Sequence, residues 1–139
     1  MKRINRLATV LSSVCLATAA QAHHSVTTHF DMTRSIEIRG VVVDFKLRSP
    51  HASMVVEGQS YVDGVLQDAT VQRWEVESSA APGLRAMGIA ADTFKPGDRI
   101  TVVAAPNRQA GFRFVNSSNF TDASGKRYSR ATAEQVQTA

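Results

Sequence analysis

The segment Ser35–Leu47 constrains the fold of this chain more than any other part of the sequence. It is rich in β-branched residues, and its apolar side chains alternate with polar ones. Because successive side chains of a strand point to opposite faces, this pattern predicts a long, half-buried β-strand. The alternation shifts by one position at Gly40, between Ile38 and Val41, and the shift predicts a bulge or a sharp coil there.

Further strands follow at short intervals, separated by turn signals. The segments with strand patterns are Ala52–Glu57, Thr70–Val76, Arg99–Ala105 and Phe112–Phe120. Asp63-Gly64 is typical of a hairpin turn within the loop 58–68, and Pro82 and Gly88 mark the start and the end of one short helix. The order of three strands, a short helix and two strands predicts an all-β fold.

The all-β fold that fits this order best is a small five- to six-stranded OB-fold-like barrel, with one short helix between strands 3 and 4. A β-sandwich is the alternative, although such a fold usually needs about seven strands.

The first 22 residues have the parts of a secretory signal peptide. A positively charged start precedes the apolar run Leu7–Ala20, and the small residues Ala20 and Ala22 stand before the expected cut. The run is shorter than the roughly 20 residues of a membrane-spanning helix. We therefore expect a cleavable signal peptide over 1–22, export to the periplasm without stable membrane insertion, and a mature protein that begins at His23.

Removal of this segment changes what the composition implies. Lys2, Arg3 and Arg6 leave with it, so 13 Lys and Arg face 12 Asp and Glu, and the formal net charge falls from +4 to about +1. A charge so close to zero argues against a nucleic-acid partner. The single cysteine, Cys15, is also removed, which excludes disulfides, a thiolate nucleophile and cysteine-ligated zinc from the mature protein.

The 117 residues that remain are enough for one compact domain. We expect a polar N-terminal arm over 23–33 that carries three of the four histidines, a β-barrel domain over 34–130, and a polar tail over 131–139. The arm is expected to be extended.

Several short motifs recur in the order seen in a known family. They are Ala22-His23-His24-Ser25-Val26, Phe30-Asp31, Gly40-Val41-Val42, Ser49-Pro50-His51-Ala52, Trp74-Glu75-Val76 and Phe94-Lys95-Pro96-Gly97-Asp98. Together they resemble a family of small exported bacterial proteins that is known only as a domain of unknown function. Ser49 stands where that family usually has asparagine. The resemblance implies a periplasmic β-barrel and attaches no established activity to it.

The histidines His23, His24, His29 and His51 are the candidate metal ligands. A mature N-terminal His23 would offer its α-amine and its ring nitrogen as one chelate, and a second imidazole would complete a three-nitrogen site that resembles the histidine brace of copper proteins. Nitrogen ligands in a tetragonal plane favour Cu(II). His51 is the preferred second imidazole because it lies at the start of a predicted strand, where the scaffold holds it. His24 and His29 are the remaining candidates. The alternative is that the histidines bind no metal and are solvated or, for His51, hydrogen-bonded to the backbone.

Two functions follow from these residues. The first is a periplasmic protein that binds copper as a carrier or buffer. The second is a metal-free OB-like module that binds a partner protein or a small ligand through the loops 58–68 and 106–111. No nucleophile elbow and no glycine-rich phosphate loop occurs in the sequence. We therefore expect a binding protein and not an enzyme.

Overall fold

A computed structural model describes residues 25–130 of the chain, and these residues form one β-sheet with two short helices. The elements are α1 (Val26–His29), β1 (Ile36–Lys46), β2 (Ser53–Val62), β3 (Val65–Leu66), β4 (Gln72–Glu77), α2 (Ala81–Ala86), β5 (Arg99–Ala104), β6 (Phe114–Asn116), β7 (Asn119–Asp122) and β8 (Arg127–Ser129). The predicted all-β class is confirmed. The signal peptide, His23, His24 and the tail 131–139 lie outside the described residues.

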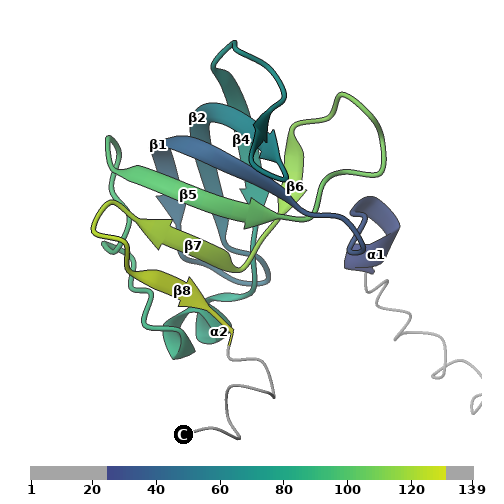
Figure 1. Ribbon diagram of the computed structural model, residues 1–139. Coiled ribbons are helices and arrows are strands. Elements are labelled where there is room, and N and C mark those ends of the chain that lie inside the picture. Colours follow the sequence, from purple (N-terminus) through teal and green to yellow (C-terminus); the bar gives the residue numbers. More distant parts are fainter. Residues whose placement is uncertain (1–24, 131–139) are drawn as a thin grey trace, which may run out of the picture.

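The strands follow one another in the order β6-β4-β2-β1-β5-β7-β8, and the short β3 pairs with β2. β4 and β6 run parallel, whereas the other pairs are antiparallel. Figure 1 shows this sheet as strongly curved, with α2 beneath it and α1 to one side. Within the described chain the sheet is not closed, because its two end strands, β6 and β8, do not pair with each other. The predicted barrel and OB-fold therefore stay a prediction.

The long first strand is present, but its irregularity lies later than the sequence predicted. The register of β1 against β2 shifts between Val42 and Asp44 and not at Gly40. Val42 is buried, whereas Val41 is exposed, so the inward-facing positions continue in phase from Ile38 through Gly40 to Val42.

Gly40 has a different role, which is close approach of two strands. It pairs with Gly58 of β2, and a β-carbon on Gly40 would lie 2.7 Å from the Cα of Gly58 and closer still to the carbonyl oxygen of Glu57. No side chain fits between the two backbones. The glycine therefore marks this contact and not the bulge.

The expected fifth strand is divided in two. β6 pairs with β4, the chain passes through Ser117 and Ser118, and β7 then pairs with β5. An isolated bridge between Ala105 and Asn116 joins the end of β5 to the end of β6. The hydroxyl of the buried Ser117 donates to the carbonyl oxygen of Val103 at 2.6 Å, which satisfies the side chain at this break. The structure thus has more strands than the five or six expected. The expected loop 58–68 is partly strand, because β2 continues to Val62 and pairs with β3.

The helix α2 lies between β4 and β5, where the sequence placed it. Pro82 occupies its first turn, and Gly88 follows it with φ at +86°. Leu84 of α2 is fully buried, and Phe94 beyond it places its ring centroid within 5.5 Å of the rings of Phe45, Phe120 and Tyr128. The helix and the segment after it thereby cover one end of the core.

The N-terminal arm is not extended. Residues Val26–His29 form α1, and Phe30 is 1% exposed, with its ring 5.1 Å from that of Phe114. The amide of Arg108 donates to the carbonyl oxygen of His29 at 2.9 Å. The arm is therefore docked against the loop after β5, because an aromatic side chain among its polar residues reaches the core.

Candidate functional site

His51 lies in the turn between β1 and β2, directly after a cis Ser49–Pro50 peptide bond. The next residue, Ala52, is fully buried, and its amide donates to the carbonyl oxygen of Ser79 at 3.1 Å. The Nδ1 atom of His51 lies 3.3 Å from Oε1 of Glu77, and about half of the imidazole surface remains exposed. The scaffold thus holds this histidine at a strand end, as expected.

A surface hollow of about 640 Å³ opens beside His51, and we call it the His51 hollow. The segment at the start of the described chain, the end of β4 and the β6–β7 junction all contribute to its wall. Its lining residues are Val26, Met32, Arg34, Ser35, Pro50, His51, Ser78, Ser79, Ala80, Val103, Ala104, Ala105, Asn116, Ser117, Ser118 and Arg130. The described lining contains two arginines and a histidine but no carboxylate.

Three serine hydroxyls meet on one side of this hollow. The Oγ of Ser118 lies 2.8 Å from that of Ser79 and 3.3 Å from that of Ser78. The Nη2 of Arg130 donates to the Oγ of Ser79 at 2.7 Å. We call these four residues the serine–arginine corner. Its members come from the end of β4, the β6–β7 junction and the end of β8, so the fold alone brings them together.

The predicted metal ligands are only partly placed. His23 and His24 fall outside the described residues. His29 ends α1, with its ring against Phe30, and is not part of the wall of the His51 hollow. In the segment 25–130, no three His, Cys, Asp or Glu side chains form a group that could hold a metal ion. The ligand pair of His23 and His51 therefore stays a prediction.

The arm that leads to the hollow carries one carboxylate with a perturbed acidity. The pKa of Asp31 is lowered, first by a hydrogen bond from the Thr33 hydroxyl and then by one from the Thr33 amide; the positive charges of Arg108 and Arg34 lower it further. The lowered pKa keeps Asp31 ionised at neutral pH, and this residue does not line the hollow.

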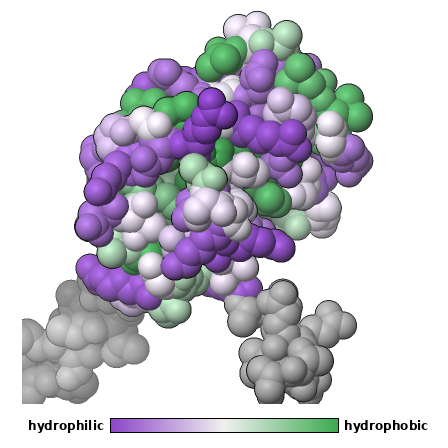
Figure 2. All heavy atoms as spheres, turned by 60° about the vertical axis from the view of Figure 1, so that its left-hand side comes forward, coloured by the Kyte–Doolittle hydropathy of each residue, from purple (hydrophilic) through white to green (hydrophobic). Residues whose placement is uncertain are grey.

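A second hollow, of about 330 Å³, lies between the loop that ends β2 and the loop that follows β5. Its wall includes Gln67 and Asp68 on one side and Asn107, Gln109 and Phe112 on the other. These residues belong to or adjoin the two segments that the alternative function assigned to a ligand, and the first of them, 58–68, includes the end of β2 and all of β3. Large apolar side chains are exposed on the loops 63–71 and 105–113, among them Val65, Leu66, Val71 and Phe112. Figure 2 shows apolar residues gathered at the upper end of the molecule, the end at which the β2–β3 turn lies in Figure 1.

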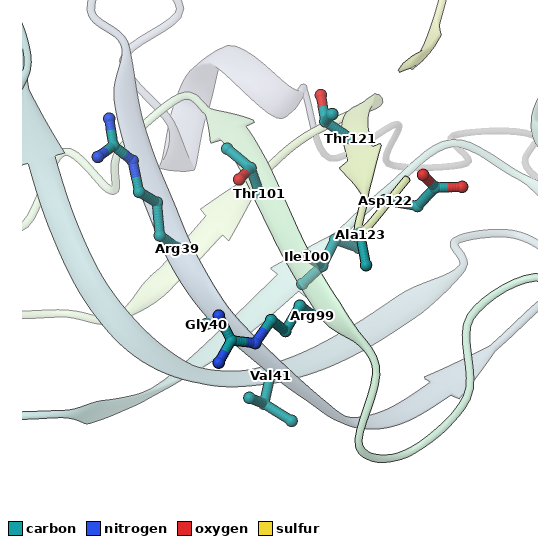
Figure 3. Close-up of a pocket in the computed structure, with 9 residues that line it drawn as sticks. All are labelled: Arg39, Gly40, Val41, Arg99, Ile100, Thr101, Thr121, Asp122 and Ala123. Carbon is teal, nitrogen blue, oxygen red and sulfur yellow. The ribbon is translucent and has the colours of Figure 1, made fainter. Parts of the chain in front are cut away.

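A third hollow, of about 440 Å³, lies on the outer surface of β1, β5 and β7. Figure 3 shows the side chains of Arg39, Thr101 and Thr121 projecting from these three strands, where they form one cross-strand row. Arg39 is already engaged, because it forms an ion pair with Glu37 and its guanidinium carbon lies 4.1 Å from the centroid of the Tyr61 ring.

Comparison with known proteins places the chain in a family. A family model described as a family of unknown function, DUF6152, matches residues 11–114. The chain belongs to the DUF6152 family. No curated protein and no solved structure gives a significant match.

The DUF6152 match includes His51 and the Ser78-Ser79 pair but ends before Ser118 and Arg130. The serine–arginine corner was not predicted from the sequence. Its only local signal is the pair of Ser-Ser dipeptides at 78–79 and 117–118, and nothing in the sequence shows that they meet. Within the described part of this DUF6152 chain, neither helix has the length and apolar character needed to cross a membrane.

Proposed function

We propose that this protein is a small periplasmic binding protein that takes Cu(II) at the His51 hollow, with the mature N-terminal His23 and His51 as ligands. One observation carries the proposal: Val26 and His51 line the same hollow. His23 stands three positions before Val26, and three extended residues reach about 10 Å. The N-terminal amine and imidazole expected at His23 are therefore within reach of the wall that holds His51.

The surroundings of His51 fit a ligand role. Metal-binding histidines commonly present one ring nitrogen to a carboxylate, which fixes the ring and makes the other nitrogen more basic. Glu77 lies 3.3 Å from Nδ1 of His51 and is mostly buried, whereas the imidazole is half exposed. A proton on Nδ1 leaves the lone pair of Nε2 for a metal. An α-amine, with an ordinary pKa of about 7.7–8.0, and two imidazoles would supply nitrogen ligands that favour Cu(II).

The barrel belongs to the same proposal. The segment from β6 to β7 pairs with β4 on one side and with β5 on the other, and the Ala105–Asn116 bridge adds a contact between these edges. A closed OB-like barrel in which this segment is the strand that closes the sheet accounts for both pairings. It also accounts for the position of α2 between β4 and β5.

The test is Cu(II) titration of the processed protein, followed by electron paramagnetic resonance. N-terminal sequencing first determines whether the exported form begins at His23. One alanine added before His23, or His51→Ala, is expected to weaken Cu(II) affinity at least tenfold and to change the spectrum. His29→Ala is the control and is expected to change neither. Unchanged affinity and spectrum after the alanine extension would exclude the N-terminal chelate.

A second candidate function has its own observation. The segments 58–68 and 106–111 border the hollow that Asp68 and Phe112 help to line. A metal-free module would bind its small ligand or partner in this hollow. Its test is a small-molecule screen by NMR on metal-free His51→Ala protein. Shifts confined to 60–72 and 106–113 would support this function, whereas shifts confined to the His51 hollow would overturn it.

A further inference from the structure

The wall of the His51 hollow combines positive charge with hydroxyl groups. Arg34 and Arg130 bring two permanent cations, and the described lining adds five serines and no acidic side chain. Guanidinium and hydroxyl groups are the donors with which proteins bind oxyanions. Away from His51, the composition of this wall therefore favours an anionic ligand.

The serine–arginine corner retains hydrogen-bond donors for a ligand. Because Arg130 donates to the Oγ of Ser79, the hydroxyl of Ser79 can itself donate to the Oγ of Ser118, at 2.8 Å. The hydrogen of Ser118 is then available for Ser78, at the longer distance of 3.3 Å, or for a ligand in the hollow. A guanidinium has five N–H groups, so Arg130 retains donors beyond its contact with Ser79.

The carboxylates near the hollow offset part of this charge at Arg34, whereas Arg130 contacts a neutral partner. Glu77 lies against Nδ1 of His51, and Asp31 interacts with the charges of both Arg108 and Arg34. Arg130 makes its contact with a neutral hydroxyl. By comparison, the outer hollow of Figure 3 also contains arginines, but Arg39 there is paired with Glu37. The His51 hollow is therefore the better anion site of the two.

We propose that the serine–arginine corner binds a small oxyanion, either a tetrahedral phosphate or sulfate or the carboxylate of a small molecule. Arg130 and Arg34 would supply the charge, and the hydroxyls of Ser79 and Ser118 would orient the oxygens. This site does not depend on copper, because none of these four side chains is a proposed metal ligand.

The experiment follows amide shifts in metal-free protein during separate titrations with sodium phosphate, sodium sulfate and sodium acetate at constant ionic strength. Saturable shifts at 78–79, 117–118 and 130 are expected. A response to phosphate and sulfate alone identifies a tetrahedral ligand, and a response to acetate alone identifies a carboxylate. Either result supports the site, whereas the absence of saturable shifts with all three anions overturns it.

Two variants test the residues. Arg130→Met is expected to weaken binding at least tenfold, and Ser118→Ala severalfold, with little change in the thermal midpoint because Arg130 is exposed. Arg99→Met removes an equal charge from the outer hollow and is the control, with unchanged affinity expected. Equal weakening by Arg99→Met would show a general charge effect and refute the site. His51→Ala is expected to lose copper and retain the oxyanion, so failure of one proposal is distinguishable from failure of the other.

Discussion

Phe30 is the residue that fixes the N-terminal arm to the sheet, and Phe30→Ala is the most direct perturbation of the proposed site. The side chain is 1% exposed and stacks edge-on against Phe114. A phenylalanine buries about 150–250 Å², which at about 25 cal/mol/Å² corresponds to about 4–6 kcal/mol. Because an extended reference chain overstates burial, and measured Phe→Ala changes cost about 3–5 kcal/mol, we expect that range.

The assay is urea denaturation, combined with amide hydrogen exchange. A loss of about 3–5 kcal/mol corresponds to a fall of roughly 10–20 °C in the thermal midpoint of a domain of this size. The amides of Asp31 and Arg108 bond to the carbonyl oxygens of Pro106 and His29, so both should exchange faster in the variant. The proposed copper site predicts that Cu(II) affinity falls as well, because the arm that leads to His23 would no longer be docked on the sheet.

The matched control is Met32→Ala, two residues along the same arm. Met32 is 51% exposed, so its truncation should change the free energy of unfolding by less than about 0.5 kcal/mol. A Phe30→Ala protein within about 1 kcal/mol of the wild type, with the amides of Asp31 and Arg108 still protected, would refute the argument that Phe30 anchors the arm.

Two further predictions concern the sheet and its turns. Gly58→Ala should lower the free energy of unfolding by more than about 3 kcal/mol or prevent folding, because the new β-carbon would meet the backbone carbonyl of Arg39. Gly64→Ala, in open space at φ +77°, should lower it by only about 1–2 kcal/mol in the same denaturation assay. An equal cost for both would contradict the close-approach argument. The pKa of Asp122 is lowered below its ordinary value of 3.8, first by the hydrogen bond from the Ser124 hydroxyl. The stabilisation from ionised Asp122 is therefore present above about pH 4 and is lost as the pH falls through the lowered pKa. Asp122→Asn should flatten the acid side of a plot of the free energy of unfolding against pH. An unchanged slope would count against this role.

The β-strand pattern was predictable because it depends on neighbouring residues. Alternation over Ser35–Leu47 predicted β1, and Pro82 and Gly88 predicted α2, because each signal acts within one turn or one strand. The position of the bulge was not predictable. The sequence offers Gly40 as the natural break, but that glycine is required by contact with Gly58 on another strand.

The arm and the last strand show the same limit. Phe30 is one of three apolar residues in the polar segment 23–33, and only its contact with Phe114 shows that it belongs to the core. The division of the expected strand 112–120 depends on the pairing of β6 with β4 and of β7 with β5, which are separate partners in the sheet. Local alternation cannot indicate a change of partner.

By itself, the sequence determined the all-β class, the short helix between β4 and β5, and the place of His51 at a strand end. Only the tertiary structure decided that His51 shares a hollow with Val26 of the arm and with the serine–arginine corner. The physical reason is sequence separation: Ser79 and Ser118 are 39 residues apart, and Arg130 is 51 residues from Ser79. Patterns along a chain reveal the period of an element, whereas the chemistry of a site depends on which elements the sheet brings together.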